Sequence, residues 1–341
     1  MTAPLAAIVS CAGPTLTADE RALFADADPA GFILFRRNCA TPEQLRDLVA
    51  SLRAAVGRDD APVLIDQEGG RVVRLPEEHW RIPPAAARFG AAARKAPERA
   101  TRAAWLNGRL IAAELCGLGI TVNTLPVLDC PAPQADPVIG DRAFAAESEL
   151  VSALGRATAG GLEAGGVTPV MKHVPGHGRA RVDSHHALPR IEAPMADLRA
   201  SDLVPFRALN DLAWAMTAHA VFDAIDPHAP VTTSGRGIRE IVRGEIGFDG
   251  LLVSDDLGMA ALRGDLAARA ADALAAGCDL VLHCSGTLDE TRRVLSGCTL
   301  ASAQTEARLA VAERRRHAGR DTAAFDAAAA RDEVNAVLET A

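Results

Sequence analysis

The sequence predicts an α/β protein built as a single (β/α)8 TIM-type barrel. Three observations lead to this fold class: short continuous apolar runs recur along the 341 residues, helical patterns separate them, and no Pro- or Ser-rich linker divides the chain. Continuous apolar strands are typical of a parallel sheet buried on both faces, and the helices supply its crossover connections. An open doubly wound sheet is the alternative, but no Gly-x-Gly-x-x-Gly motif follows an early strand.

The elements follow from the apolar patterns in chain order. The predicted strands are residues 6–9, 31–35, 62–65, 120–124, 167–171, 212–217, 251–253 and 279–283. The predicted helices are residues 41–55, 99–115, 151–164, 235–245 and 259–276, followed by an Ala-rich helical tail at about 303–341. Thr41 is the expected N-cap of the first of these helices. We expect residues 1–341 to form one barrel domain, with irregular early strands allowed and no second α/β domain.

Composition and charge narrow the function classes. The chain is 49% hydrophobic and 23% charged, as in folded proteins, and its net charge of −8 argues against nucleic acid or an anionic membrane as a partner. A signal peptide and an apolar membrane span are both lacking, so a cytoplasmic protein is expected. The seven Cys are scattered without Cys-x-x-Cys spacing, which suits reduced thiols better than disulfides or a zinc site.

Polar residues gather where the predicted strands end. Asp66, Lys172, His173, His219 and Asp255 all lie at or just after the end of an apolar run. In a barrel the C-terminal ends of the strands face one mouth, where active sites are built. The sequence therefore predicts one site formed by these residues.

The densest group of reactive side chains is residues 172–178 (Lys-His-Val-Pro-Gly-His-Gly), followed by residues 183–185 (Asp-Ser-His). Gly and Pro exclude regular structure there. In an extended loop Asp183 and His185 would point to the same side, so the carboxylate could meet a ring nitrogen and orient the ring for proton transfer. An unpaired surface Asp and His are the alternative.

Three further motifs carry carboxylates or Arg at predicted strand ends or in loops. In residues 253–258, one of Asp255 and Asp256 could be a nucleophile while the other caps the next helix, or both could be caps. Residues 65–74 and 138–144 place Asp66, Arg74 and Arg142 where their oxygens and N–H groups could bind sugar hydroxyls. Turns with solvated charges are the alternative for both.

These four motifs follow one another along the chain in the order found in the β-N-acetylhexosaminidases of glycoside hydrolase family 3. Over residues 31–284 the sequence resembles that family. The resemblance is closest to the short bacterial enzymes of peptidoglycan recycling. It implies a (β/α)8 barrel that removes non-reducing terminal N-acetylglucosamine from GlcNAc-anhydroMurNAc muropeptides by a retaining double displacement.

The resemblance also implies a role for each matching residue. Asp255 would be the nucleophile, His185 the general acid/base, and Asp183 the residue that orients and tunes His185. The residues that hold the sugar ring would be Asp66, Arg74, Arg142, Lys172 and His173. The loop at residues 175–178 would be mobile and bring His185 over the leaving oxygen. No cofactor or metal is implied, and we expect a monomer or weak dimer acting on a small sugar substrate.

Three residues depart from the family pattern and bear on loop closure and leaving-group preference. Val174 stands where Phe is frequent, Arg179 stands where Asp is usual, and Arg181 adds a second charge. A β-glucosidase or an N-acetylglucosamine phosphorylase of the same family is an alternative, the latter because a neutral His would not repel phosphate. Two other classes stay open, a non-catalytic sugar-binding barrel and a metal-dependent barrel hydrolase. The ligands of the latter would be His173, His177, Asp183, His185 and His186.

Overall fold

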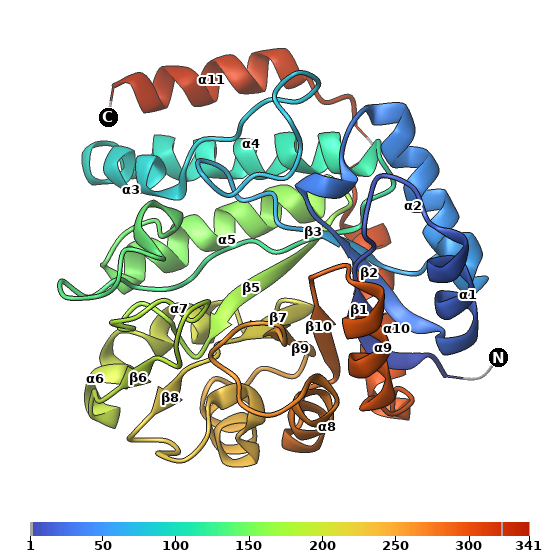
Figure 1. Ribbon diagram of the computed structural model, residues 1–341. Coiled ribbons are helices and arrows are strands. Elements are labelled where there is room, and N and C mark those ends of the chain that lie inside the picture. The colour runs from blue at the N-terminus through green and yellow to red at the C-terminus, as the bar shows by residue number, and fades with distance from the viewer. Residues whose placement is uncertain (1–2, 322, 341) are drawn as a thin grey trace.

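The computed structural model describes residues 3–321 and 323–340 and has a closed barrel of parallel strands at its centre (Figure 1). The barrel strands are β1 (Leu5–Val9), β2 (Pro29–Leu34), β3 (Val63–Ile65), β4 (Val122–Asn123), β5 (Thr168–Val174), β7 (Trp214–Thr217), β9 (Leu251–Asp256) and β10 (Leu280–His283). Around the barrel their order is β1-β10-β9-β7-β5-β4-β3-β2. The predicted (β/α)8 barrel is confirmed, and each predicted run contributes one of its strands.

Alternating side chains of the strands build two apolar layers. In β1, Ala6 and Ile8 belong to the cluster inside the barrel, whereas Ala7 and Val9 belong to the cluster between strands and helices. Both faces are therefore buried, which explains why the strands are continuously apolar in sequence. The helix α10 (Ala303–Gly319) covers the N-terminal ends of the strands, and its Ala312 joins the inner cluster.

Helices surround the barrel and fill the connections between strands (Figure 1). They are α1 (Ala18–Ala27), α2 (Pro42–Val56), α3 (Ala86–Lys95), α4 (Pro97–Cys116), α5 (Ser148–Ala164), α6 (Met195–Ala200), α7 (Leu203–Ala208), α8 (Leu266–Ala276), α9 (Leu288–Ser296) and α11 (Ala327–Glu339). Short helical segments are η1 (Arg36–Asn38), η2 (Gly140–Arg142), η3 (Val231–Thr233) and the π-helical η4 (Gly237–Glu245). Thr41 caps α2 as predicted, because its hydroxyl accepts from the backbone N–H of Gln44.

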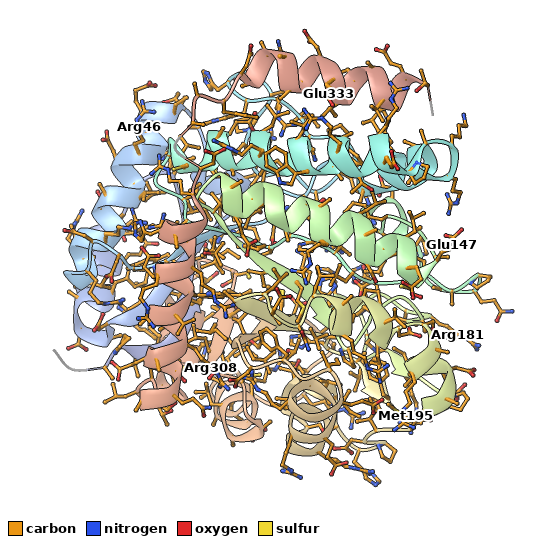
Figure 2. The ribbon with its side chains drawn as sticks, turned by 180° about the vertical axis from the view of Figure 1, so that it is seen from behind. Arg46, Glu147, Arg181, Met195, Arg308 and Glu333 are labelled. Atoms are coloured by element: carbon orange, nitrogen blue, oxygen red, sulfur yellow. The ribbon has the colours of Figure 1, made fainter. Side chains whose placement is uncertain are left out.

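The predicted C-terminal tail is two helices that pack on the barrel. α10 is anchored by Arg308, which is labelled in Figure 2 and pairs with Asp249 at 2.7 Å and with Asp279 at 2.9 Å. α11 packs along α4 (Figure 1). Residues 322 and 341 of the predicted tail lie outside the described residues.

The structure corrects one predicted helix and two strand ends. The helix predicted at residues 259–276 begins only at Leu266, because the side chain of Asp265 accepts from Ala268 N–H and starts α8 there. β5 continues to Val174 and β9 to Asp256, so that Lys172, His173 and Asp255 lie within the last three residues of their strands and not in loops. Strand geometry therefore holds these three side chains.

Several elements were not predicted from the sequence. They are the helices α1, α3 and α9, the short helices α6 and α7, and a two-stranded sheet of β6 (Arg190–Ile191) and β8 (Val221–Phe222). An early irregularity was allowed for, and the pairing of β1 with β2 does shift register between Leu5 and Ile8. All seven Cys are free thiols. Within residues 3–321 and 323–340, no helix is long and apolar enough to cross a membrane.

Candidate active site

One cavity of about 470 Å³ lies at the C-terminal ends of the barrel strands. Its lining includes Asp66, Arg74, Arg142, Lys172, His173, Asp183, His185 and Asp255, whereas His219, which was expected at the same mouth, does not line it. They come from β5, β9 and the loops after β3, β4 and β5. The side chains of Asp66, Lys172, His173 and Asp255, all at or just after strand ends, therefore face one cavity.

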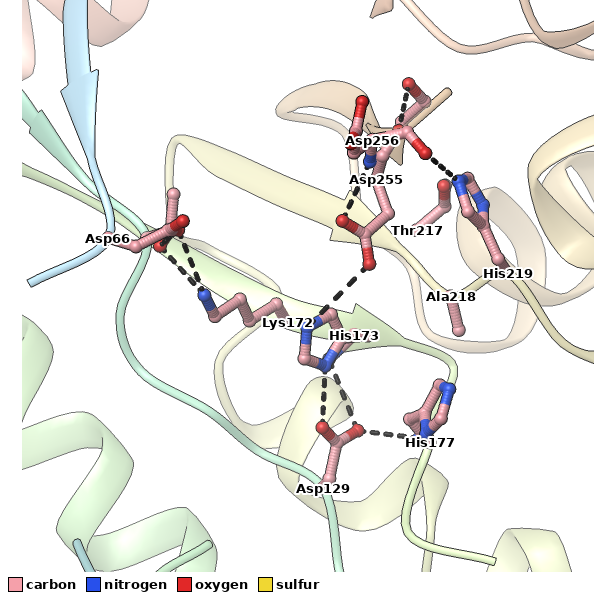
Figure 3. Close-up of polar contacts among 12 residues, drawn as sticks. Asp66, Asp129, Lys172, His173, His177, Thr217, Ala218, His219, Asp255 and Asp256 are labelled. Atoms are coloured by element: carbon pink, nitrogen blue, oxygen red, sulfur yellow. Dashed lines mark hydrogen bonds and ion pairs between the residues drawn. The ribbon is translucent and has the colours of Figure 1, made fainter. Parts of the chain in front are cut away.

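One side of the cavity is a buried network of acids and bases. Lys172 Nζ lies 2.6 Å from Glu68 Oε1 and 3.4 Å from Asp66 Oδ1, and it donates to Thr124 Oγ1 at 2.8 Å. Arg142 donates two hydrogen bonds of 2.8 Å to Glu68, and Arg74 pairs with Asp66 at 3.0 Å. Figure 3 shows the contact between Asp66 and Lys172. Fixed donors and acceptors of this kind suit a ligand with several hydroxyl groups.

The cations of this network keep its acids ionised. Burial opposes ionisation of Asp66, but the charges of Lys172 and Arg74 outweigh it and hold the pKa of Asp66 well below its usual range. Burial likewise opposes ionisation of Glu68, yet Lys172 and Arg142 lower its pKa to about 2. Both acids therefore stay acceptors at neutral pH. Glu68 was given no role from the sequence, although it is a charged residue two positions after Asp66 in a strand-end motif.

Asp255 lies at the end of β9 with its carboxylate in the cavity (Figure 3). Its Oδ2 lies 4.0 Å from Nε2 of His173, and its Oδ1 accepts from the backbone N–H of Asp256 at 2.8 Å. Burial raises the pKa of Asp255, but His173 and His219 outweigh this effect and the net shift is downward. The side chain is thus an ionised carboxylate beside an open cavity, as a nucleophile must be.

The neighbouring Asp256 does not cap a helix, which was one alternative from the sequence, but binds backbone N–H groups of two loops. Its Oδ1 accepts from the backbone N–H groups of Gly258 and Cys284, both at 3.0 Å. These bonds tie the turn after β9 to the end of β10. No helix begins there, since α8 starts at Leu266. Of the two Asp residues, only Asp255 is left without a backbone partner outside its own turn.

Asp183 and His185 make the predicted contact on the loop after β5. Nδ1 of His185 lies 2.7 Å from Oδ1 of Asp183, and the same oxygen accepts from the His185 backbone N–H at 2.8 Å. The segment is a turn and not the extended loop that was predicted, so the two side chains meet by chain reversal. The His185 side chain is 60% exposed and that of Asp183 26%. Burial opposes the shift, but the bonds from His185 lower the pKa of Asp183.

Contacts with other parts of the chain hold this loop on both sides of Asp183. Arg179 Nε donates to Asp202 Oδ2 at 2.8 Å, so the unusual Arg has a partner at the start of α7. The carbonyl of Ser184 accepts from Ala261 N–H at 3.2 Å, which joins the loop to the turn that was predicted as helix. Arg181 is exposed and labelled at the surface in Figure 2. The turn that carries His185 is thus outside the barrel strands, unlike Lys172, His173 and Asp255.

A second aspartate–histidine pair lies below the cavity and was missed in the sequence. Asp129 is completely buried, and its Oδ2 lies 2.7 Å from Nδ1 of His173 (Figure 3). Its Oδ1 accepts from the backbone N–H of His173 at 3.3 Å and of His177 at 2.6 Å. Burial raises the pKa of Asp129, but His173 outweighs it and brings the pKa to about 2. The available signal was an apolar run, residues 125–128, that ends at an acid.

The remaining histidines have other surroundings. His219 is buried and contacts Thr232 and the backbone carbonyl of Asp256. His283 is a fully buried residue at the end of β10. His177 is buried with both ring nitrogens lacking a hydrogen-bond partner in the described part of the chain, and burial lowers its pKa to about 4. Among residues 3–321 and 323–340, no three His, Cys, Asp or Glu side chains are grouped so that they could hold a metal ion.

A known protein family covers most of this chain. Residues 5–315 match the family model described as the glycosyl hydrolase family 3 N terminal domain. The chain belongs to this family. It is therefore a glycoside hydrolase.

Named relatives place it near one branch of family 3. It is 42% identical over 287 residues to a β-hexosaminidase of Methylococcus capsulatus, covering 83% of each chain. It is 32% identical to NagZ from Neisseria gonorrhoeae, solved in complex with N-trifluoroacetyl-D-glucosamine, with a TM-score of 0.88 and 99% of both chains covered. A family 3 β-N-acetylglucosaminidase from Paenibacillus is 31% identical with a TM-score of 0.85, and the match covers 97% of this chain but 66% of that one.

Proposed function

We propose that this glycoside hydrolase is a β-N-acetylhexosaminidase, specifically a retaining exo-β-N-acetylglucosaminidase. The observation that carries the proposal is the placement of Asp255 and the Asp183–His185 pair on one cavity, from separate elements, beside a network of fixed hydrogen-bonding groups. Cleavage of a glycoside needs a carboxylate to trap the positive carbon and a proton for the leaving oxygen. The names of its relatives support N-acetylglucosamine as the sugar.

The buried network would hold the sugar ring. Asp66 and Glu68 offer carboxylate oxygens to hydroxyl hydrogens, whereas Lys172, Arg74 and Arg142 offer N–H groups to hydroxyl oxygens. These groups already hold one another in position, so little side-chain freedom would be lost when a sugar binds. Together with His173, they would place the anomeric carbon at Asp255.

In the first step, a carboxylate oxygen of Asp255 attacks the anomeric carbon while His185 donates a proton to the glycosidic oxygen. The bond to the leaving group breaks, and a glycosyl-aspartate ester forms. In the second step, His185 takes a proton from water, whose oxygen attacks the same carbon and releases Asp255. Because Nδ1 of His185 is held by Asp183, Nε2 is the atom that carries the proton in both steps.

The exposed position of His185 fits an acid/base group that must serve first a leaving group and then water.

We propose GlcNAc-anhydroMurNAc muropeptides as the physiological substrate and the cytoplasm as the location. In this proposal the chain is one catalytic barrel with the tail of about residues 303–341, acting as a monomer or weak dimer without a cofactor. The roles of Asp255, His185 and Asp183, and those of the sugar-binding residues, are part of the same proposal.

The test is a panel of aryl glycosides with the same leaving group. We expect release from the β-N-acetylglucosaminide to be faster than from the β-glucoside and the β-N-acetylgalactosaminide. Proton NMR of the first product should show the β-anomer before mutarotation, because two displacements at one carbon retain configuration. Fastest release from the glucoside, or α-configured first product, would contradict the proposal.

A further inference from the structure

Asp129, which contacts His173 in the buried pair, has no part in the cleavage steps proposed above. Asp129 is inaccessible to solvent and is not among the residues that line the cavity, so it would not touch a sugar bound there. His173 lines the cavity and lies between Asp129 on one side and Asp255 on the other (Figure 3). Through His173, a contact made by Asp129 therefore reaches the side of the cavity where Asp255 lies.

The two oxygens of Asp129 have separate partners. Oδ1 accepts from backbone N–H groups of His173 and His177, whereas Oδ2 accepts from the ring of His173 at 2.7 Å. A carboxylate can only accept, so the ring must carry a hydrogen on Nδ1 whether it is neutral or charged. Nε2 is then the ring atom that faces Asp255, at 4.0 Å.

We infer that Asp129 is a positioning residue for glycoside cleavage, which acts through His173 on the side of the sugar where Asp255 attacks. The inference rests on the proposed function, since it needs Asp255 to be the nucleophile. Asp129 keeps the hydrogen on Nδ1 of His173 and holds Nε2 toward Asp255 and the sugar. The site thus has two Asp–His pairs with different tasks, one for the leaving group and one for the attacking face.

Asp129→Asn changes this contact with little change of shape. The Asn side-chain oxygen can still accept from the two backbone N–H groups that Oδ1 holds, whereas its NH₂ group replaces Oδ2. An NH₂ group donates, so Nδ1 of His173 must become an acceptor and the ring hydrogen moves to Nε2. Asp183→Asn is the comparison in the other Asp–His pair, where one oxygen of the acid meets both the ring and a backbone N–H, so that the variant removes the negative charge beside His185.

The dependence of activity on the leaving group distinguishes the roles of the two Asp–His pairs. Aryl β-N-acetylglucosaminides from dinitrophenyl to methoxyphenyl would be compared by kcat/KM, which reports the first, bond-breaking displacement. We expect Asp183→Asn to lose most activity on the poor leaving groups and little on dinitrophenyl, which needs no proton. Asp129→Asn should lose about 100-fold on every substrate, because the attacking face is the same in all of them.

Two outcomes would overturn the inference. One is a loss in Asp129→Asn that shrinks with better leaving groups, which would place the effect on the His185 loop through His177. The other is full activity in Asp129→Asn. Should the wild type release no aryl group from any N-acetylglucosaminide, the proposed function itself would be wrong, and that result is separate from either outcome.

A second measurement does not depend on the folding of Asp129→Asn. In ¹⁵N-histidine spectra of the wild-type protein, the His173 signals are those lost in His173→Gln, and they should show a hydrogen on Nδ1. A ring protonated only on Nε2 would overturn the inference. The double variant Asp129→Asn/His173→Gln should be no slower than His173→Gln, because Asp129 has nothing left to act through.

Discussion

Two aspartate–histidine pairs serve the same cavity, and in each a carboxylate oxygen lies 2.7 Å from Nδ1 of the ring. The pair of Asp129 and His173 is buried, and His173 is part of strand β5. The pair of Asp183 and His185 lies on a turn, with the His side chain 60% exposed. The same contact is thus built once into the barrel and once onto a loop. Rigid placement suits a face where atoms must be aligned, whereas a mobile group suits an acid that meets changing partners.

The largest effects should come from the groups that carry the chemistry. Asp255→Asn removes the nucleophile, and we expect kcat to fall on the order of 10⁴-fold or more. His185→Ala should lower kcat by about 10²- to 10⁴-fold on a substrate with a poor leaving group. Circular dichroism and the melting temperature should stay close to wild type in His185→Ala, since its ring is exposed. Near-full activity in either variant would refute the assigned role.

The two pairs should differ strongly in their contribution to stability. Asp129→Ala leaves the His173 ring and two backbone N–H groups without their buried acceptor, so we expect the free energy of unfolding to fall by about 3 kcal/mol or more. Asp183→Ala should cost less than about 1 kcal/mol, because solvent can replace the lost contact. Urea unfolding of both variants measures the difference. Equal losses would mean that burial does not separate the two pairs.

The smallest effect concerns pH and the histidine next to the buried pair. Burial lowers the pKa of His177 from 6.5 to about 4, so the unfolded chain binds this proton more readily than the folded one. Keeping His177 neutral therefore does not lower the free energy of unfolding above about pH 6.5, whereas this free energy falls as the pH drops from there toward about 4. Between about pH 7.5 and about pH 5 the loss from this group should be about 2 kcal/mol.

The matched variant for this prediction is His177→Gln, which cannot titrate but keeps the backbone N–H that Asp129 accepts. Its free energy of unfolding, measured in urea at both pH values, should fall by less than that of the wild type. The comparison uses the change with pH and not the absolute stability, so a packing defect would not imitate it. Parallel pH dependence in the two proteins would show that His177 titrates normally.

Much of the site was predictable because it lies where strands end. The runs before Asp66, Lys172 and Asp255 are apolar on both faces, and such runs mark buried parallel strands by composition alone. The contact of Asp183 with His185 was predictable because the residues are two apart, although it forms in a turn and not in an extended loop. The helix predicted at residues 259–276 was wrong in its first part, since periodicity did not reveal the cap at Asp265.

Asp129 was not predictable in this way. Its partner His173 lies 44 residues further along the chain, and the contact depends on the loop after β4 passing beside β5. The link of Glu68 to Lys172 and Arg142 spans two loops and a strand in the same manner. Each residue is an ordinary acid in the sequence, and only its surroundings in the barrel give it a partner.

By itself, the sequence determined the (β/α)8 barrel, the end of the barrel that carries the site and many of the residues that line it, though not Glu68, since hydrophobic period and strand ends are local properties. The tertiary structure alone decided which acid meets which base, and how deeply. Burial and neighbouring charge set the pKa of each group, and both depend on residues brought together from distant parts of the chain. Two Asp–His pairs with the same 2.7 Å contact are therefore an exposed contact on a loop in one place and a buried part of the barrel in the other.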